Sequence, residues 1–213
     1  MHPGFSSYAP SAAATTLLDV ATTRASSPAR EAWWRVGAAL FVTVLTAVAA
    51  QISIPLPFTP VPLTFQPMIV LLSGAALGPR LGMTSQVFYL ALGIAGLPVF
   101  AASPVLAPGA ARLLGPTGGY LMSYPFAAFV SGWLAERGCA RRYVTVVAAM
   151  AAGLAVVFAG GVSWLALVVQ PSHGLRSALA AGFFPFILPD LLKLLAAAWV
   201  LPGLWWLAAS RTS

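Results

Sequence analysis

The chain has 213 residues, of which 60% are hydrophobic and 7% are charged, and its mean hydropathy is +0.89. A soluble domain carries charge on about a quarter of its residues, so eleven Lys and Arg with four Asp and Glu cannot cover a 22.0 kDa globule. The composition therefore excludes a soluble domain and predicts an integral membrane protein, in which each spanning helix takes about 20 residues.

Residues 1–30 are rich in Ser, Ala, Thr and Pro and have no periodic pattern of hydrophobic residues, which is typical of a flexible segment. The first long apolar run begins only after Arg35, so the beginning of the chain does not resemble a signal peptide. We expect a flexible cytoplasmic tail over residues 1–30 and a membrane domain over residues 31–213.

Apolar runs interrupted by Pro and Gly predict an all-α membrane bundle with six transmembrane helices. The first five predicted spans are residues 36–54, 62–78, 81–97, 117–135 and 144–169. The sixth, residues 180–208, contains Pro185 and Pro189, and we expect its regular helix to begin at Pro189 because proline favours the first helical position. Residues 98–116 form a long apolar connection that we expect to fold back over the bundle.

The cations predict the orientation of this bundle. With both termini inside, only Arg112 and Arg176 lie outside, Lys193 lies within a span, and the other eight cations are cytoplasmic: Arg24, Arg30, Arg35, Arg80, Arg137, Arg141, Arg142 and Arg211. Such an asymmetry indicates an N-in, C-in topology. The net charge of +7 is then an orientation signal, so nucleic acid is not expected as a partner, whereas anionic lipid is a possible one.

Asp190 and Lys193 are the two ionisable residues inside a predicted span. Charges within a membrane are costly, by about 3 kcal/mol or more, and usually functional. At a spacing of three residues they share a helix face and can pair with each other, offering an acceptor and donors to a polar solute. In the alternative interpretation, Asp190 complements the beginning of a helix and Lys193 extends to the membrane surface.

Other polar residues form a weaker signal. Gln66, Gln86, Tyr89 and Tyr120 can line a cavity, although buried Gln and Tyr are as often hydrogen-bond partners between helices. The segment 115–120 places two glycines, Gly118 and Gly119, directly before Tyr120, which allows a ligand to approach the backbone closely.

Small residues recur every four positions in the first predicted span, at Ala39, Thr43 and Ala47. Such a stripe allows another helix to approach closely, either within the chain or from a partner.

Neither histidine has a second ligand at metal-binding spacing, and the single cysteine excludes an intrachain disulfide. We therefore expect no metal, no cofactor and no catalytic residues. There is also no nucleotide-binding loop, so the chain is not expected to hydrolyse ATP. An intramembrane enzyme that uses Asp190 and Lys193 as acid and base remains an alternative, although no nucleophile accompanies the pair.

Five segments resemble one known family when taken together and in order: QISIPLPFTPVPLT at 51–64, GPR at 78–80, GLPVF at 96–100, LGPTGGY at 114–120 and PDLLK at 189–193. They are similar to the BioY family, the biotin-binding membrane subunits (S components) of energy-coupling factor (ECF) transporters. The resemblance covers about residues 36–205 and does not include the tail.

The resemblance implies a six-helix bundle in the bacterial inner membrane that binds biotin from outside. A transmembrane coupling (T) subunit and two ATPase subunits would then drive its release inward, although some members are reported to work alone. An S component for a different vitamin is the closest alternative.

The resemblance also assigns residues. It implies that Asp190 and Lys193 supply polar contacts to biotin and that Gly118, Gly119 and Tyr120 adjoin the ligand. Relatives carry a polar ligand residue between the third and fourth spans, for which Ser103 is the candidate here, and Arg112 is a candidate for the biotin carboxylate. The stripe Ala39, Thr43 and Ala47 corresponds to the family's docking surface for the coupling subunit, with Thr43 departing from alanine.

Overall fold

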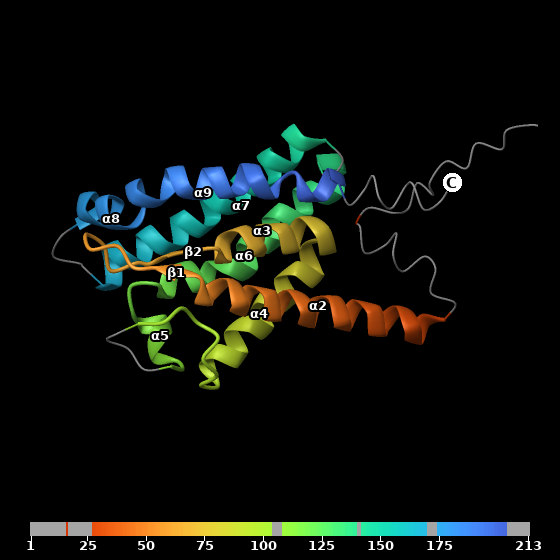
Figure 1. Ribbon diagram of the computed structural model, residues 1–213, viewed down its shortest axis with the longest axis horizontal. Coiled ribbons are helices and arrows are strands. Elements are labelled where there is room, and N and C mark those ends of the chain that lie inside the picture. Colours follow the sequence, from red (N-terminus) through yellow and green to blue (C-terminus); the bar gives the residue numbers. More distant parts are fainter. Residues whose placement is uncertain (1–15, 17–26, 104–107, 140–141, 170–173, 204–213) are drawn as a thin grey trace, which may run out of the picture.

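A computed structural model describes residue 16 and residues 27–103, 108–139, 142–169 and 174–203. In these residues the chain is almost entirely helical, with one short hairpin (Figure 1). The elements are α2 (Pro28–Gln51), β1 (Ser53–Ile54), β2 (Leu63–Thr64), α3 (Gln66–Leu77), α4 (Pro79–Ile94), α5 (Ala111–Leu114), α6 (Gly118–Leu134), the π-helical turns η1 (Ala135–Cys139) and η2 (Leu165–Val169), α7 (Tyr143–Trp164), α8 (Gly174–Gly182) and α9 (Phe184–Ala197).

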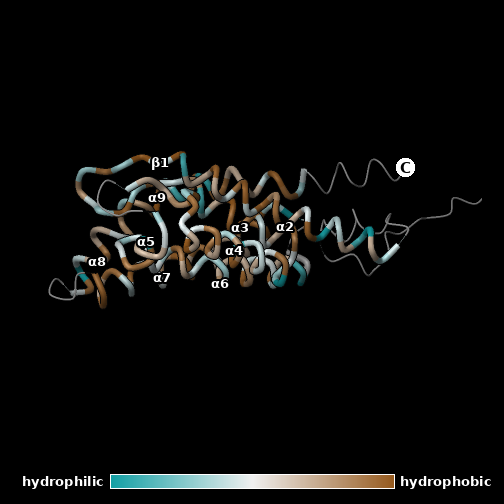
Figure 2. The backbone as a smooth tube through the Cα atoms, turned by 90° about the horizontal axis from the view of Figure 1, so that it is seen from below, coloured by the Kyte–Doolittle hydropathy of each residue, from teal (hydrophilic) through white to brown (hydrophobic). Residues whose placement is uncertain are grey.

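Helix α2 begins eight residues before the predicted span. Ser27 caps it by accepting a hydrogen bond from the Arg30 backbone N–H at 3.3 Å, and Pro28 occupies the first turn, a combination that favours a helix start. The added turns are exposed and project from the bundle, with hydrophilic residues among them (Figures 1 and 2). Residues 28–30 therefore belong to a helix and not to a tail, while most of the predicted tail lies outside the described residues.

The segment between the first two long helices forms a hairpin. Ser53 pairs with Thr64 and Ile54 with Leu63, in antiparallel register. The intervening loop contains Pro55, Pro57, Pro60 and Pro62, which lack backbone donors and cannot extend the ladder. The hydroxyl of Thr59 donates to the Ala181 carbonyl at 2.5 Å, so the loop is tied to the end of α8.

Helix α6 lies at the centre of the bundle and packs against α3, α4 and α7. Its contact with α7 is close because glycines face each other: a Cβ on Gly119 would overlap Trp164 and the Gly160 carbonyl. A Cβ on Gly160 would in turn crowd Ser123 and the Gly119 carbonyl. Small residues allow helices to approach in this way inside membranes.

The last predicted span is divided differently from our expectation. The break falls at Phe183, between α8 and α9, so α9 begins five residues earlier than predicted. Pro185 takes the first turn of α9, and Pro189 lies inside the helix. Both prolines suit a helix start, and the sequence pattern alone could not decide which of them begins α9.

Three helical stretches among the described residues are long and apolar enough to cross a membrane: Pro28–Gln51, Tyr143–Val169 and Gly174–Gly203. Gln66–Leu77 is apolar but shorter, at 12 residues. The outward faces are also hydrophobic, as in Phe41, which is 66% exposed, and Leu167, which is 75% exposed. Hydrophobic residues occupy much of the described chain (Figure 2), as expected of a multi-pass membrane protein.

Candidate functional site

A pocket is lined in part by residues of the hairpin and of α5, and these elements lie at the same end of the bundle (Figure 1). The empty space within the pocket, including space that is open to solvent, is about 600 Å³. Segments from most of the chain contribute to its wall: Val61, Pro62, Leu63, Thr64, Gln66, Pro67, Phe100, Ala101, Arg112, Thr117, Tyr120, Leu121, Tyr124, Val157, Phe158, Phe186 and Asp190.

Aromatic side chains make up much of this wall. Tyr120 and Tyr124 come from α6, Phe158 from α7 and Phe186 from α9, and all four are buried. Phe100 adds a ring from the connection between α4 and α5. Such a surface suits a flat, largely apolar ligand, whose orientation a few polar groups would fix.

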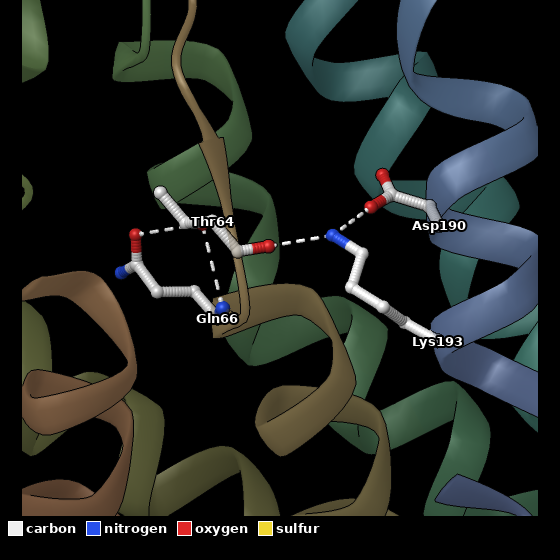
Figure 3. A network of polar contacts seen from close by, with 4 residues as sticks. All are labelled: Thr64, Gln66, Asp190 and Lys193. Carbon is white, nitrogen blue, oxygen red and sulfur yellow. Dashed lines mark hydrogen bonds and ion pairs between the residues drawn. The ribbon is translucent and has the colours of Figure 1, made fainter. Parts of the chain in front are cut away.

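Asp190 and Lys193 form an ion pair beside this pocket. The ammonium of Lys193 is paired with Oδ1 of Asp190, and the side chain of Lys193 is 13% exposed and that of Asp190 is 7% exposed. The same ammonium donates to the Thr64 carbonyl at 2.6 Å, which joins α9 to strand β2 (Figure 3). Asp190 lines the pocket and Lys193 does not. Lys193 therefore compensates the charge of Asp190 and fixes its position, while the carboxylate faces the pocket.

Gln66, the first residue of α3, is another polar residue in the wall. Its amide donates to the Tyr89 hydroxyl at 2.6 Å, and its carbonyl oxygen accepts a bond from the Thr64 hydroxyl at 3.4 Å (Figure 3). One N–H of the amide remains to serve a ligand. Tyr89 itself is fully buried behind Gln66 and is not part of the wall.

The segment 118–120 divides into one wall residue and two packing residues. Tyr120 lines the pocket and donates its hydroxyl to the Gly182 carbonyl at 2.6 Å, which holds the break between α8 and α9 against α6. Gly118 and Gly119 are not in the wall. Their missing side chains make room for the Leu113 carbonyl and for α7, so the glycines bring protein backbone close together instead of a ligand.

Arg112 belongs to the pocket, and Ser103 is not part of its wall. The Arg112 guanidinium donates to the Ala101 carbonyl at 2.7 Å and is 8% exposed. Burial lowers the pKa of this guanidinium from its usual value, although an arginine stays charged in proteins. The pocket thus has a cation and an anion, Arg112 and Asp190, on different segments.

Gln86 lies outside the pocket wall, in a polar cluster between α2, α3 and α4. Its amide nitrogen lies 3.3–3.4 Å from the hydroxyls of Thr46, Ser73 and Ser85, which share its two N–H donors. Here the arrangement agrees with the second interpretation of the polar residues, as hydrogen-bond partners between helices.

The stripe of small residues on α2 faces the inside of the chain. Ala39 and Thr43 are buried, and the Thr43 hydroxyl donates to the Ser85 carbonyl of α4 at 2.9 Å. A coupling subunit could reach these two residues only if α2 and α4 separated. The structure therefore favours packing within the chain for Ala39 and Thr43, while Ala47 is half-buried.

Sequence reasoning missed several wall residues, among them Tyr124, Phe158 and Phe186. Two of them had a signal, because Tyr124 follows Tyr120 by four positions and Phe186 precedes Asp190 by four, so each shares a helix face with a predicted site residue. Phe158 had none, since it lies in an apolar run without a polar neighbour. In the described part of the chain, no three His, Cys, Asp or Glu side chains come together as a metal site would require.

The sequence matches the BioY family over residues 22–210. The "Probable biotin transporter BioY" of Pyrococcus horikoshii is 44% identical over 155 residues, which cover 73% of this chain and 85% of that protein. The "Biotin transporter BioY" of Thermotoga maritima is 44% identical over 156 residues, which cover 73% of this chain and 86% of its own length.

A solved structure is also similar. The crystal structure of the S-component for biotin from an ECF-type ABC transporter superposes with a TM-score of 0.74 at 27% sequence identity. The superposition covers 84% of this chain and 93% of that chain.

Proposed function

Because this chain belongs to the BioY family, we propose that it binds biotin and serves biotin uptake as the substrate-specific S component of an ECF-type transporter. The observation that carries the proposal is the aromatic pocket with Asp190 in its wall, formed in part by the segments that resemble the family. The similar proteins are named as transporters. The chain is accordingly a transport subunit, and the enzyme alternative is dropped.

The chemistry of biotin fits this pocket. Biotin has a compact bicycle with a ureido group, an apolar chain and a carboxylate. The carboxylate of Asp190 accepts the ureido N–H groups in our proposal, and Lys193 holds that carboxylate in place. Gln66 and Tyr120 flank the bicycle, and Arg112 binds the biotin carboxylate.

We further propose six spans with both termini inside, in the inner membrane of a bacterium. The pocket end then faces outward, because the predicted outer cations Arg112 and Arg176 lie in α5 and α8. Arg30, Arg35, Arg80, Arg137 and Arg142 belong to the opposite, cytoplasmic side, in agreement with the positive-inside rule.

A transmembrane coupling subunit and ATPase subunits are the proposed partners. The similarity to an S component of an ECF-type ABC transporter supports such partners, as does the absence of a nucleotide-binding loop in the sequence. Biotin is the transported ligand in this proposal and not a cofactor.

Binding of labelled biotin to the purified chain tests the function. We expect saturable binding that desthiobiotin displaces, because that compound keeps the ureido group that Asp190 would recognise. Lipoate, thiamine and riboflavin serve as matched competitors. Absence of saturable biotin binding, together with saturable binding of labelled lipoate, thiamine or riboflavin, would favour the alternative of an S component for another vitamin.

A further inference from the structure

Residues 98–101, which we call the strap, follow α4 and have no regular secondary structure. All four successive carbonyls of the strap lie within hydrogen-bond distance of side chains of other elements. The Gln51 amide nitrogen lies 3.2 Å from the Pro98 carbonyl and 3.5 Å from the Phe100 carbonyl, and it also lies 3.3 Å from the Ala47 carbonyl of its own helix, so its two N–H groups are shared among these three acceptors. Tyr89 donates to the Val99 carbonyl at 3.1 Å, and Arg112 to the Ala101 carbonyl at 2.7 Å.

The strap forms part of the pocket wall through Phe100 and Ala101. Its position is also fixed by packing, because the Phe100 ring fills the space where Gly93 lacks a side chain. The ring meets that of Tyr89 edge to face, with centroids 5.4 Å apart. An irregular segment whose carbonyls are already held by side chains loses less conformational entropy when a ligand binds.

Tyr89 connects the strap to the polar part of the pocket. Its hydroxyl accepts a hydrogen bond from the Gln66 amide at 2.6 Å and donates its proton to the Val99 carbonyl. A hydroxyl has one proton, and Tyr89 donates that proton to Val99. The two hydrogen bonds therefore run in one direction, from Gln66 through Tyr89 to Val99. Tyr89 does not touch the pocket itself.

We propose that Tyr89 and Gln51 are positioning residues for ligand binding: they hold the strap as a preformed wall of the pocket, and Tyr89 also orients the Gln66 amide toward the ligand. The effect on affinity rests on the proposed function, with biotin as the ligand. The effect on the strap itself does not.

Tyr89→Phe tests the proposal because it keeps the ring and removes only the hydroxyl. The matched control is Tyr143→Phe, since the Tyr143 hydroxyl also donates to a backbone carbonyl, that of Leu195, at 3.1 Å, but lies outside the pocket wall. We expect Tyr89→Phe to weaken biotin binding about tenfold, because two buried hydrogen bonds lose their shared partner. Tyr143→Phe should bind within about twofold of the unmodified chain.

A second measurement reports on the strap without biotin. Ala101→Cys, in a chain whose only cysteine is removed by Cys139→Ser, places a thiol on the half-buried wall of the strap. A hydrophilic maleimide should label it at least about threefold faster when Tyr89→Phe is added, and no faster with Tyr143→Phe. Gln51→Met, at an exposed site on the end of α2, should also speed labelling and keeps the test open if Tyr89→Phe folds poorly.

Equal labelling rates in the Tyr89→Phe, Gln51→Met and Tyr143→Phe chains would overturn the proposal, as would equal loss of biotin affinity in Tyr89→Phe and Tyr143→Phe. Absence of biotin binding in the unmodified chain would instead refute the proposed function. The labelling rates would still decide whether Tyr89 and Gln51 position the strap.

Discussion

Asp190 is buried and Lys193 is partly buried at the point where α9 meets strand β2. Two opposite charges in a low-dielectric site lose their hydration. Only their attraction to each other and added hydrogen bonds compensate for the free-energy cost of that loss. The bond from Lys193 to the Thr64 carbonyl supplies one such addition. Removing either charge alone leaves the other without compensation, so single and double substitutions should differ.

Asp190→Asn should weaken biotin binding at least about a hundredfold and lower the stability of the ligand-free chain, because the Lys193 charge is left buried without its partner. The double change Asp190→Asn with Lys193→Met should recover the stability but not the binding. Binding of labelled biotin and thermal unfolding in detergent provide the two measurements.

Glu31→Gln is the matched control, since it breaks an exposed ion pair with Arg35 whose side chains are 43% and 45% exposed, and such pairs contribute about 0–1 kcal/mol. Full biotin affinity in the double variant would show that the ion pair is not part of the binding site.

Single residues were predictable where the sequence makes them unusual. Asp190 and Lys193 are conspicuous as charges within an apolar segment. Gln66 and Gln86 look alike in the sequence, yet Gln66 faces the pocket and Gln86 faces α2 and α3. The orientation of a helix that is apolar on all sides depends on its neighbours, which the sequence of that helix does not specify.

Helices α6 and α7 are in close contact at two glycines. Gly119 and Gly160 face each other there, and Trp164 covers the contact while its indole N–H donates to the Gly115 carbonyl at 3.0 Å. This bond holds the segment before α6, where Thr117 joins the pocket wall. The sequence suggested a ligand near Gly118 and Gly119, because two glycines before a helix indicate a close approach without revealing what approaches.

Gly119→Ala should lower the thermal stability of the chain, because its methyl group would overlap Trp164 and the Gly160 carbonyl. Overpacking of this kind costs about 1–3 kcal/mol, and thermal unfolding in detergent measures it. Gly37→Ala in α2 is the matched control, since a Cβ there meets nothing within 4 Å and alanine favours a helix by up to about 1 kcal/mol. An unchanged or raised unfolding temperature for Gly119→Ala would contradict the assigned contact between α6 and α7.

Over the whole molecule, hydropathy and charge were sufficient to predict a helical membrane protein. The pocket was not predictable in the same way, because its wall combines the hairpin, the strap and five helices from different parts of the sequence. The sequence identified the polar residues Asp190, Gln66 and Arg112, whereas most of the aromatic wall follows from the packing of the bundle.

The proposed function assigns biotin binding to the pocket of this chain and the supply of energy to ATPase subunits. Binding alone can move a solute only toward equal concentrations on the two sides of a membrane, because no step supplies free energy. The chain reconstituted by itself in vesicles should therefore bring internal biotin no higher than external biotin. With a coupling subunit, ATPase subunits and ATP, internal biotin should exceed external biotin.

Labelled biotin inside the vesicles is the readout, and the full assembly carrying Asp190→Asn is the control that should not accumulate it. Accumulation by the chain alone, without ATP or an ion gradient, would contradict the proposal that this chain only binds biotin and that the ATPase subunits supply the free energy for its uptake.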